Sequence, residues 1–229
     1  MKNDFEKRFH RLQHRISVAQ AARENAHGKV TLIAASKTKS TTEIRKVALA
    51  GVTNFGENYL QEALQKIKDL QKLNLCWHFI GAIQSNKTAA IAKHFDWVHT
   101  VDRLKIAQRL SRQRSDNAAE LNVLIQVNID NEPQKAGVSV DKLASLAKDI
   151  ESLPRLKLRG LMAIPRARVD AAAQDEVFAK VAACHKLIAA QIGKHFDSLS
   201  MGMSNDLEPA IKAGATHIRV GNDLFGPRN

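Results

Sequence analysis

The stretch SMGMSNDLEPAIKAGATHIRVGNDLFG, residues 200–226, joins two apolar segments through a turn and a helical pattern. Its spacing predicts strands over residues 198–201 and 217–221, with a helix over 207–213 between them. A glycine-containing turn follows each predicted strand. A strand, a helix and a second strand in this order form the repeating unit of a parallel sheet.

The same alternation extends back through most of the chain. Six further strands are predicted over residues 30–36, 53–58, 76–82, 97–101, 122–129 and 156–164. Helical patterns follow them over residues 41–50, 60–72, 86–95, 103–113, 140–152 and 172–192. Thr41 or Thr42 is the expected N-cap of the first of these helices, and Gly51 is its C-terminal stop.

An amphipathic helix precedes the first strand. Between residues 4 and 26, apolar side chains recur at helical spacing, at Phe5, Phe9, Leu12, Ile16 and Ala19. This helix belongs to none of the strand–helix units, so we expect it to pack on the outside of the sheet that they form.

Eight strands separated by helices fit two architectures, an open doubly wound sheet and a closed (β/α)8 TIM barrel. The Gly-x-Gly-x-x-Gly fingerprint of dinucleotide-binding sheets is absent after the first strand. The length of 229 residues is close to the roughly 250 typical of the barrel. We therefore predict a single α/β barrel domain over residues 1–229, with residues 1–27 as an N-terminal helix packed on it.

The composition is that of a globular protein of a reducing compartment. Hydrophobic residues make up 44% and charged residues 25%, and no apolar run has the length of a membrane span. The polar start MKNDFEKRFHRLQHR does not resemble a secretory signal. Cys76 and Cys184 are far apart and lack metal-site spacing, so we expect a cytoplasmic protein without a metal.

The formal net charge of +12 raises the alternative of a nucleic-acid-binding protein. The basic residues are spread along the chain, however, and aromatic residues make up only 5%. A stacking surface for single strands therefore has little to build on. A basic surface that attracts small anions explains the charge equally well, and we expect no nucleic-acid and no membrane partner.

Lys37 is the first candidate for chemistry, because it directly follows the predicted strand over residues 30–36. Active-site residues of TIM barrels gather at the carboxyl ends of the strands. A lysine that attacks an aldehyde must lose its proton, which burial or a neighbouring cation favours. Lys39 is placed to supply that cation if the chain stays extended. The alternative is an ordinary solvent-exposed lysine at a strand end.

The two C-terminal turns are candidates for a phosphate site. Ser204 offers a hydroxyl group at the start of a predicted helix, and Gly221 and Asn222 offer backbone N–H groups after the last strand. Unpaired N–H groups at such positions bind anions. TIM barrels often hold phosphate in the loops after strands seven and eight, which are these loops. The alternative is two tight turns that glycine merely permits.

Arg219 lies within the last predicted strand, between the apolar residues Ile218 and Val220. Side chains alternate along a strand, so Arg219 points away from both neighbours and lines the barrel. A buried guanidinium needs an acceptor. The ring nitrogen of a bound heterocycle and the carboxylate of an acid such as Glu57 are the two alternatives.

A lysine after strand one, phosphate turns after strands seven and eight, and an arginine in strand eight together suggest pyridoxal 5′-phosphate. The sequence resembles the pyridoxal phosphate homeostasis protein family, which comprises single-domain relatives of the alanine racemase barrel. The matching segments are SKTK (36–39), FGENYLQE (55–62), WHFIGAIQSNK (77–87), GLMAIP (160–165), LSMGMSND (199–206) and RVG with FG (219–226). They occur in order and cover nearly the whole chain after the first helix.

The resemblance implies a barrel of PLP fold type III without a second β-rich domain. Lys37 would form the internal aldimine with pyridoxal 5′-phosphate, and Asn58 would lie near the ring. Arg219 would face the pyridine nitrogen, where it makes the ring a poorer electron sink. The implied role is homeostasis of vitamin B6 and amino-acid balance by a monomeric protein that has no established catalytic residue.

The resemblance also implies that Ser204, Gly221 and Asn222 hold the phosphate group. Family members commonly have Thr or Ser at the position of Asn222, so altered phosphate binding is expected in this chain. Pro209 stands where the family often has a small residue. Proline is tolerated only in the first turn of a helix, which places the helix cap at Asn205 or Asp206.

An amino-acid racemase that uses the same cofactor is the alternative function. Racemases of the related fold add a β-rich domain that completes the site, and the eight strand–helix units leave no residues for one. Only Tyr59, the single tyrosine of the chain, is available as a tyrosine base. The resemblance therefore favours a binding protein whose partners are the cofactor and the apo-enzymes that need it.

Overall fold

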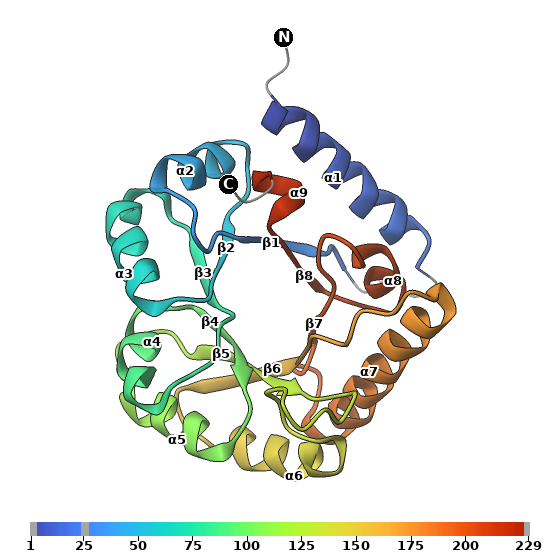
Figure 1. The fold of residues 1–229 in the computed structure, drawn as a ribbon. Helices are drawn as coiled ribbons and strands as arrows, with labels where there is room; N and C mark the ends of the chain where they lie inside the picture. Colours follow the sequence, from blue (N-terminus) through green and yellow to red (C-terminus); the bar gives the residue numbers. More distant parts are fainter. Residues whose placement is uncertain (1–3, 24–27, 227–229) are drawn as a thin grey trace.

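Eight parallel strands form a closed barrel in this structure, a computed structural model that describes residues 4–23 and 28–226 (Figure 1). Each strand pairs with its neighbours in chain order, and β1 pairs with β8 to close the ring. The strands are β1 (Thr31–Ala35), β2 (Asn54–Glu57), β3 (Cys76–Phe79), β4 (Trp97–Val101), β5 (Leu121–Val127), β6 (Leu156–Ala163), β7 (Ser198–Ser200) and β8 (His217–Val220). The predicted TIM barrel is confirmed, and the open sheet is wrong.

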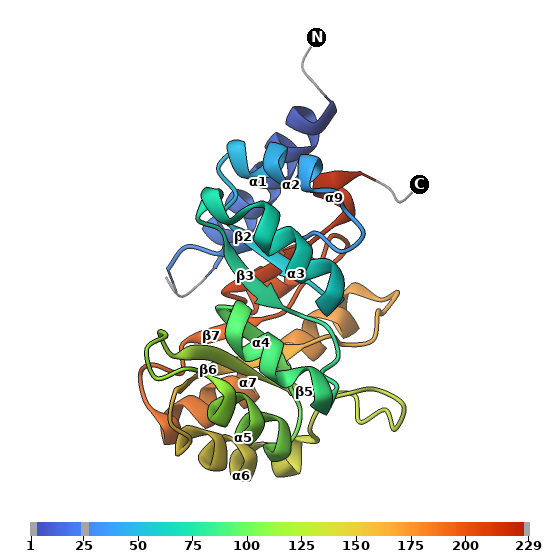
Figure 2. The ribbon, with the colours of Figure 1, turned by 90° about the vertical axis from the view of Figure 1, so that its left-hand side faces the viewer.

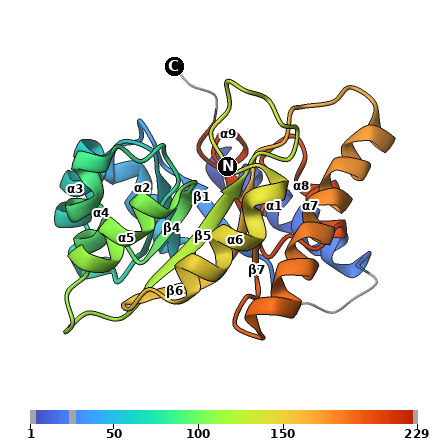
Figure 3. The ribbon, with the colours of Figure 1, turned by 90° about the horizontal axis from the view of Figure 1, so that it is seen from below.

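Helices cover the outside of the barrel (Figures 1 and 2). They are α1 (Asp4–Ala21), α2 (Thr41–Leu49), α3 (Leu60–Asp69), α4 (Thr88–His94), α5 (Leu104–Gln113), α6 (Val140–Glu151), α7 (Ala171–Ile192), α8 (Leu207–Lys212) and α9 (Asn222–Phe225). For example, α6 packs on β5 and β6, and α7 packs on β6 (Figure 3). Within the described chain, no helix combines the length and the hydropathy needed to cross a membrane.

Helix α1 lies against α8 and α9 on the outside of the barrel (Figure 1). It ends at Ala21, before the end of the predicted range, and residues 24–26 of that range lie outside the described residues. Its buried residues are the five that the helical spacing predicts, Phe5, Phe9, Leu12, Ile16 and Ala19. The apolar face of α1 therefore attaches this helix to the elements that follow β7 and β8.

Ser40, rather than Thr41 or Thr42, is the N-cap of α2. Its hydroxyl accepts the backbone N–H of Glu43 at 3.2 Å, and the Glu43 carboxylate accepts the backbone N–H of Ser40 at 2.8 Å. This reciprocal capping box satisfies two backbone donors that the first turn of the helix leaves free. It also fixes the point at which the loop that carries Lys37 ends.

A continuous chain of hydrogen-bonded polar side chains runs through the barrel interior. Nη1 of Arg219 donates to Oγ of Ser200 at 2.7 Å, and this hydroxyl donates to Nδ1 of His99 at 3.0 Å. Nε2 of His99 donates to Nδ1 of His78, and Nε2 of His78 donates to Oδ1 of Asn54, both at 2.9 Å. Burial lowers the pKa of both histidines, so each carries one ring proton. Arg219 at one end of the chain can only donate and Oδ1 of Asn54 at the other can only accept, so every hydrogen bond between them is donated in the direction from Arg219 to Asn54.

The buried histidines make the barrel sensitive to acid. Burial lowers the pKa of His217 to about 4, and the nearby charge of Arg159 acts in the same direction. An unfolded histidine binds its proton near pH 6.5. The free energy of unfolding should therefore fall as the pH drops from about 6.5 to about 4, by up to about 3 kcal/mol from His217 alone.

Urea unfolding at pH 7 and at pH 4.5 measures this loss. His217→Gln removes the titrating ring and should lose less stability than the wild type between the two pH values. His10→Gln, on the exposed side of α1, is the control and should show the wild-type loss. An undiminished loss in His217→Gln would contradict the role given to this histidine.

Candidate functional site

A pocket of about 330 Å³ lies at the carboxyl end of the barrel. Its wall is built from the end of β1 and the segments that follow β2, β3, β6, β7 and β8. All six site residues predicted from the sequence line it, namely Lys37, Asn58, Ser204, Arg219, Gly221 and Asn222. The structure therefore brings together residues that are up to 185 positions apart, while their roles toward a ligand stay predictions.

The pocket carries more positive than negative charge. Lys37, Lys39 and Arg219 line it, against the single carboxylate of Asp206. Burial raises the pKa of Asp206, which makes that carboxyl easier to neutralise. Among the described residues, no side chain forms an ion pair or hydrogen bond with the Lys37 ammonium group. The arrangement suits an anionic ligand and leaves one amine free to react.

The turn after β1 separates Lys37 from Lys39. Thr38 has a φ of 64°, so the chain does not continue in extended form, and the N–H of Lys39 donates back to the Ser36 carbonyl at 3.0 Å. Nζ of Lys39 lies 3.3 Å from a carboxylate oxygen of Glu43. The condition under which Lys39 would supply a cation to Lys37, an extended chain, is therefore not met, and the charge of Lys39 is partly balanced by Glu43.

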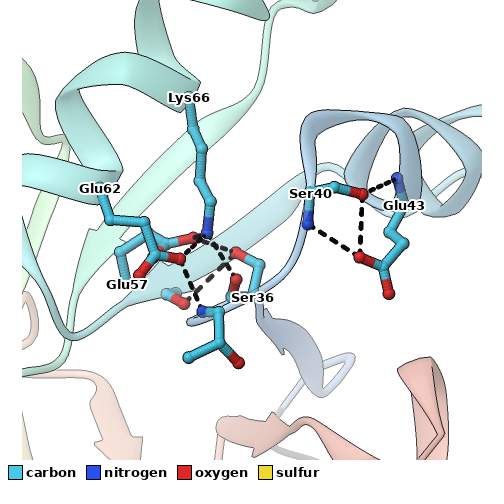
Figure 4. Close-up of polar contacts among 8 residues, drawn as sticks. Ser36, Ser40, Glu43, Glu57, Glu62 and Lys66 are labelled. Atoms are coloured by element: carbon cyan, nitrogen blue, oxygen red, sulfur yellow. Dashed lines mark hydrogen bonds and ion pairs between the residues drawn. The ribbon is translucent and has the colours of Figure 1, made fainter. Parts of the chain in front are cut away.

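Glu57 is fully buried and pairs with Lys66 rather than with Arg219 (Figure 4). Oε1 of Glu57 accepts from Nζ of Lys66 at 2.8 Å and from the Ser36 hydroxyl at 2.6 Å. Burial raises the pKa of Glu57, and the bonds from Lys66 and Ser36 oppose that rise. The predicted alternative, in which Glu57 is the acceptor for Arg219, is therefore wrong.

Arg219 is 5% exposed and makes two hydrogen bonds inside the barrel. One goes to the Ser200 hydroxyl, and the other runs from Nη2 to the Ala163 carbonyl at 3.0 Å. Burial lowers the pKa of Arg219 to about 10, so the guanidinium remains charged at neutral pH. A guanidinium has five N–H donors, and these two bonds leave donors available to an acceptor in the pocket.

Asn58 presents an unused acceptor at the same pocket. Its Oδ1 is buried and accepts no hydrogen bond from the described residues. The backbone at Asn58 is held by a close approach of the loop after β3, because a Cβ atom at Gly81 would lie 2.2 Å from the Asn58 carbonyl oxygen. A buried acceptor without a partner marks a position that a ligand donor can fill.

The loops after β7 and β8 supply unpaired polar groups. Within the described chain, neither the Ser204 hydroxyl nor the N–H of Asn222 has a hydrogen-bond partner.

Asp206 is the N-cap residue of α8, as expected, but its carboxylate accepts the N–H of Met203 at 2.6 Å instead of capping the helix. Pro209 lies in the first turn of α8. The turn predicted after β8 contains α9, which the sequence pattern missed.

Arg15 of α1 joins these two loops from the outside. Its Nε and Nη2 donate to the Glu208 carboxylate at 2.5 and 2.9 Å, and Nη2 also donates to the Ser204 carbonyl at 2.8 Å. Its Nη1 pairs with Asp223. The bonds with Glu208 raise the pKa of Arg15 and lower that of Glu208. Sequence reasoning missed Arg15, because its partners lie 189 or more positions away.

A larger cavity, of about 570 Å³, lies between α1 and the amino ends of β1 and β2. Lys29 is the one charged side chain among its described lining residues. Barrels of this type place their chemistry at the opposite, carboxyl end. The smaller pocket, with its converging cations and unpaired acceptor, is therefore the candidate site.

Known proteins identify the family. The model of the family "Alanine racemase, N-terminal domain" matches residues 9–229. A pyridoxal phosphate homeostasis protein of Pseudomonas aeruginosa is 51% identical over 94% of this chain and 92% of its own length. The chain belongs to the pyridoxal phosphate homeostasis protein family. Another member, from Escherichia coli K12, is 44% identical over 99% of this chain and 98% of its own length.

Solved structures agree with this assignment to the pyridoxal phosphate homeostasis protein family. PipY of Synechococcus elongatus, solved with PLP bound, superimposes with a TM-score of 0.80 at 35% identity, covering 93% of this chain and 99% of PipY. Alanine racemase from Corynebacterium glutamicum shares the fold, with a TM-score of 0.66 at 16% identity, and this chain covers 60% of it. The fold and the family predicted from the sequence are confirmed.

Proposed function

We propose that this chain binds pyridoxal 5′-phosphate in the pocket at the carboxyl end of the barrel and takes part in the homeostasis of that cofactor. One observation carries the proposal. Lys37, whose amine has no partner among the described residues, lines the same cationic pocket as the unpaired groups of Ser204 and Asn222. Membership of the family and the PLP bound in PipY support the same ligand.

The phosphate would bind to the loops after β7 and β8. The Ser204 hydroxyl and the N–H of Asn222 are donors without partners in the described chain. Gly221 places the backbone of the second loop in the wall of the pocket. The neighbouring lysines add positive charge at this end of the barrel. The Asn222 side chain offers an amide where the family commonly has the hydroxyl of Thr or Ser, so altered rather than absent phosphate binding is expected.

The ring would lie between Arg219 and Asn58. Arg219 is a buried donor, so it suits an unprotonated pyridine nitrogen, and the unfilled Oδ1 of Asn58 suits a donor on the ligand. When bound, the cofactor supplies an aldehyde that condenses with an amine with loss of water. Lys37 provides that amine at the end of β1.

We infer binding and buffering rather than turnover. Proton transfer at a substrate carbon requires a positioned acid or base. Tyr59, the single tyrosine, is 56% exposed and does not line the pocket. An arginine that donates to the ring nitrogen keeps that nitrogen unprotonated, so the ring is a poorer electron sink for a carbanion. The curated relatives are named as homeostasis proteins rather than as enzymes.

An absorbance spectrum with added pyridoxal 5′-phosphate tests the proposal. We expect a visible band from lysine-bound cofactor, and borohydride reduction followed by peptide mapping should place the label on Lys37. A racemase assay on the loaded protein should show no turnover above background. The absence of a band, or a label spread over surface lysines, would overturn the proposed function.

Arg15→Ala should weaken phosphate binding, although Arg15 itself does not line the pocket. Loss of the guanidinium frees the Ser204 carbonyl, Glu208 and Asp223, so the two loops lose their common anchor. We expect the affinity for pyridoxal 5′-phosphate to fall about tenfold, which corresponds to ~1.4 kcal/mol. The affinity for pyridoxal, which lacks the phosphate, should stay unchanged in the same titration.

Arg11→Ala is the matched control, because Arg11 is exposed on the same helix and forms no ion pair within the described chain. It should bind both compounds as the wild type does. Equal losses for pyridoxal and its phosphate in Arg15→Ala would show that Arg15 supports the barrel in general and not the phosphate loops.

A further inference from the structure

Two charged side chains of α3, Lys66 and Glu62, bind the peptide groups on either side of Lys37, and Figure 4 shows both side chains together with Ser36. Nζ of Lys66 donates to the Ser36 carbonyl at 2.7 Å, which fixes the peptide group before Lys37. Oε1 of Glu62 accepts the N–H of Thr38 at 2.6 Å, which fixes the peptide group after it. Lys66 and Glu62 also pair with each other, so the two restraints belong to one unit.

Two fixed peptide planes determine the direction in which the Lys37 side chain leaves the backbone. The backbone of Lys37 can rotate only about φ and ψ, the two bonds that join it to these peptide planes. When both planes are held, neither rotation remains free. Thr38 has a φ of 64°, a conformation that threonine rarely adopts. The bond from its N–H to Glu62 stabilises this conformation, so the shape of the turn depends on that carboxylate.

All the hydrogen-bond donors of the Lys66 ammonium group have acceptors within the described chain. Its three N–H donors go to the Ser36 carbonyl, Glu57 and Glu62, and the residue is 4% exposed. The Ser36 hydroxyl adds a second bond to Glu57. A buried ion pair contributes little net stability compared with well-packed apolar residues, whereas its geometry is strict. The main contribution of these buried pairs is therefore the fixed geometry that they give to the backbone beside them.

We propose that Glu57, Glu62 and Lys66 are positioning residues that aim Lys37 into the pocket and set the rate at which it bonds to the cofactor aldehyde. None of the three lines the pocket, so they act through the backbone beside Lys37. In the step they promote, the Nζ lone pair forms the bond to the aldehyde carbon, and the two amine hydrogens leave with the aldehyde oxygen as water. This inference rests on the proposed function.

Glu62→Ala is the sharpest test, because the Glu62 side chain is 30% exposed and its loss leaves Lys66 paired with Glu57. The rise of the visible band after mixing with pyridoxal 5′-phosphate measures bonding to Lys37. Pyridoxamine 5′-phosphate has the same ring and phosphate but no aldehyde, so its affinity measures the rest of the site. We expect the bonding rate to fall about tenfold or more, with that affinity unchanged within about twofold.

Two variants accompany this test. Glu62→Gln keeps an oxygen that accepts the Thr38 N–H, so it should retain more of the bonding rate than Glu62→Ala. Glu176→Ala removes the acid of an exposed pair with Lys180, at the same i,i+4 spacing on α7, and should bond at the wild-type rate.

A wild-type bonding rate in Glu62→Ala would overturn the positioning role. Parallel losses of bonding rate and of pyridoxamine 5′-phosphate affinity would also overturn it, because they would indicate general damage to the pocket. If the wild-type protein itself shows no visible band, the proposed function fails, and this result is separate from the comparison of variants.

Discussion

Lys37→Ala should abolish the visible band of lysine-bound cofactor while leaving the pocket able to bind phosphate and ring. The Lys37 amine has no partner among the described residues, and it stands at the end of β1 in the wall of the pocket. Alanine removes the amine and leaves the Ser204 and Asn222 groups in place. We expect complete loss of the band and of borohydride labelling, with the affinity for pyridoxamine 5′-phosphate changed by less than about threefold.

Lys39→Ala is the matched control for this result. Lys39 lines the same pocket, but its ammonium group is 3.3 Å from Glu43 and lies over the Phe225 ring, 5.8 Å from the centroid. These contacts occupy its ammonium group, so Lys39 should not replace Lys37, and Lys39→Ala should keep the band. A full band in Lys37→Ala would show that another lysine carries the cofactor.

Gly160→Ala should be the most destabilising single substitution considered for this barrel. Gly160 lies in β6 with a φ of 152°, and a Cβ atom there would stand 1.7 Å from the Ser198 carbonyl oxygen of β7. The pairing of β5 with β6 also shifts register at this point. Backbone strain and overpacking each cost about 1–3 kcal/mol, so we expect a loss of about 4 kcal/mol.

Urea unfolding of the apo-protein measures that loss, and Gly214→Ala separates its two causes. Gly214 also has a positive φ, of 109°, but a Cβ atom there would meet nothing within 4 Å. It should therefore show the backbone cost alone, about 1 kcal/mol. Equal losses in the two variants would rule out the close approach to β7 as the main cause.

The strand and helix pattern predicted the barrel because each element is short, apolar on the side it buries and separated by clear turn residues. β4 has the predicted limits, 97–101. β3 ends at Phe79, earlier than predicted, because Gly81 turns the chain beneath Asn58. α9 was missed because its four residues are too few to show a helical period.

The candidate pocket was predictable where chemistry and position coincide at a strand end. Lys37 closely follows an apolar strand, Arg219 stands between apolar neighbours, and the barrel places the two strands side by side. The residues that support them give no such signal. Glu62 and Lys66 have the i,i+4 spacing of an ordinary exposed pair on a helix, yet Lys66 is buried beneath the turn of Lys37.

Arg15 has a consequence for how this sequence can change over evolutionary time. It lies in a helix that precedes the barrel, yet its charge is balanced by Glu208 and Asp223, which are 193 and 208 positions away. Loss of Arg15 leaves both partly buried carboxylates without this partner, and loss of either acid removes one of the two ion pairs of Arg15. Selection should therefore treat these distant positions as a single inherited unit, so that the first helix and the last two loops of the barrel diverge together.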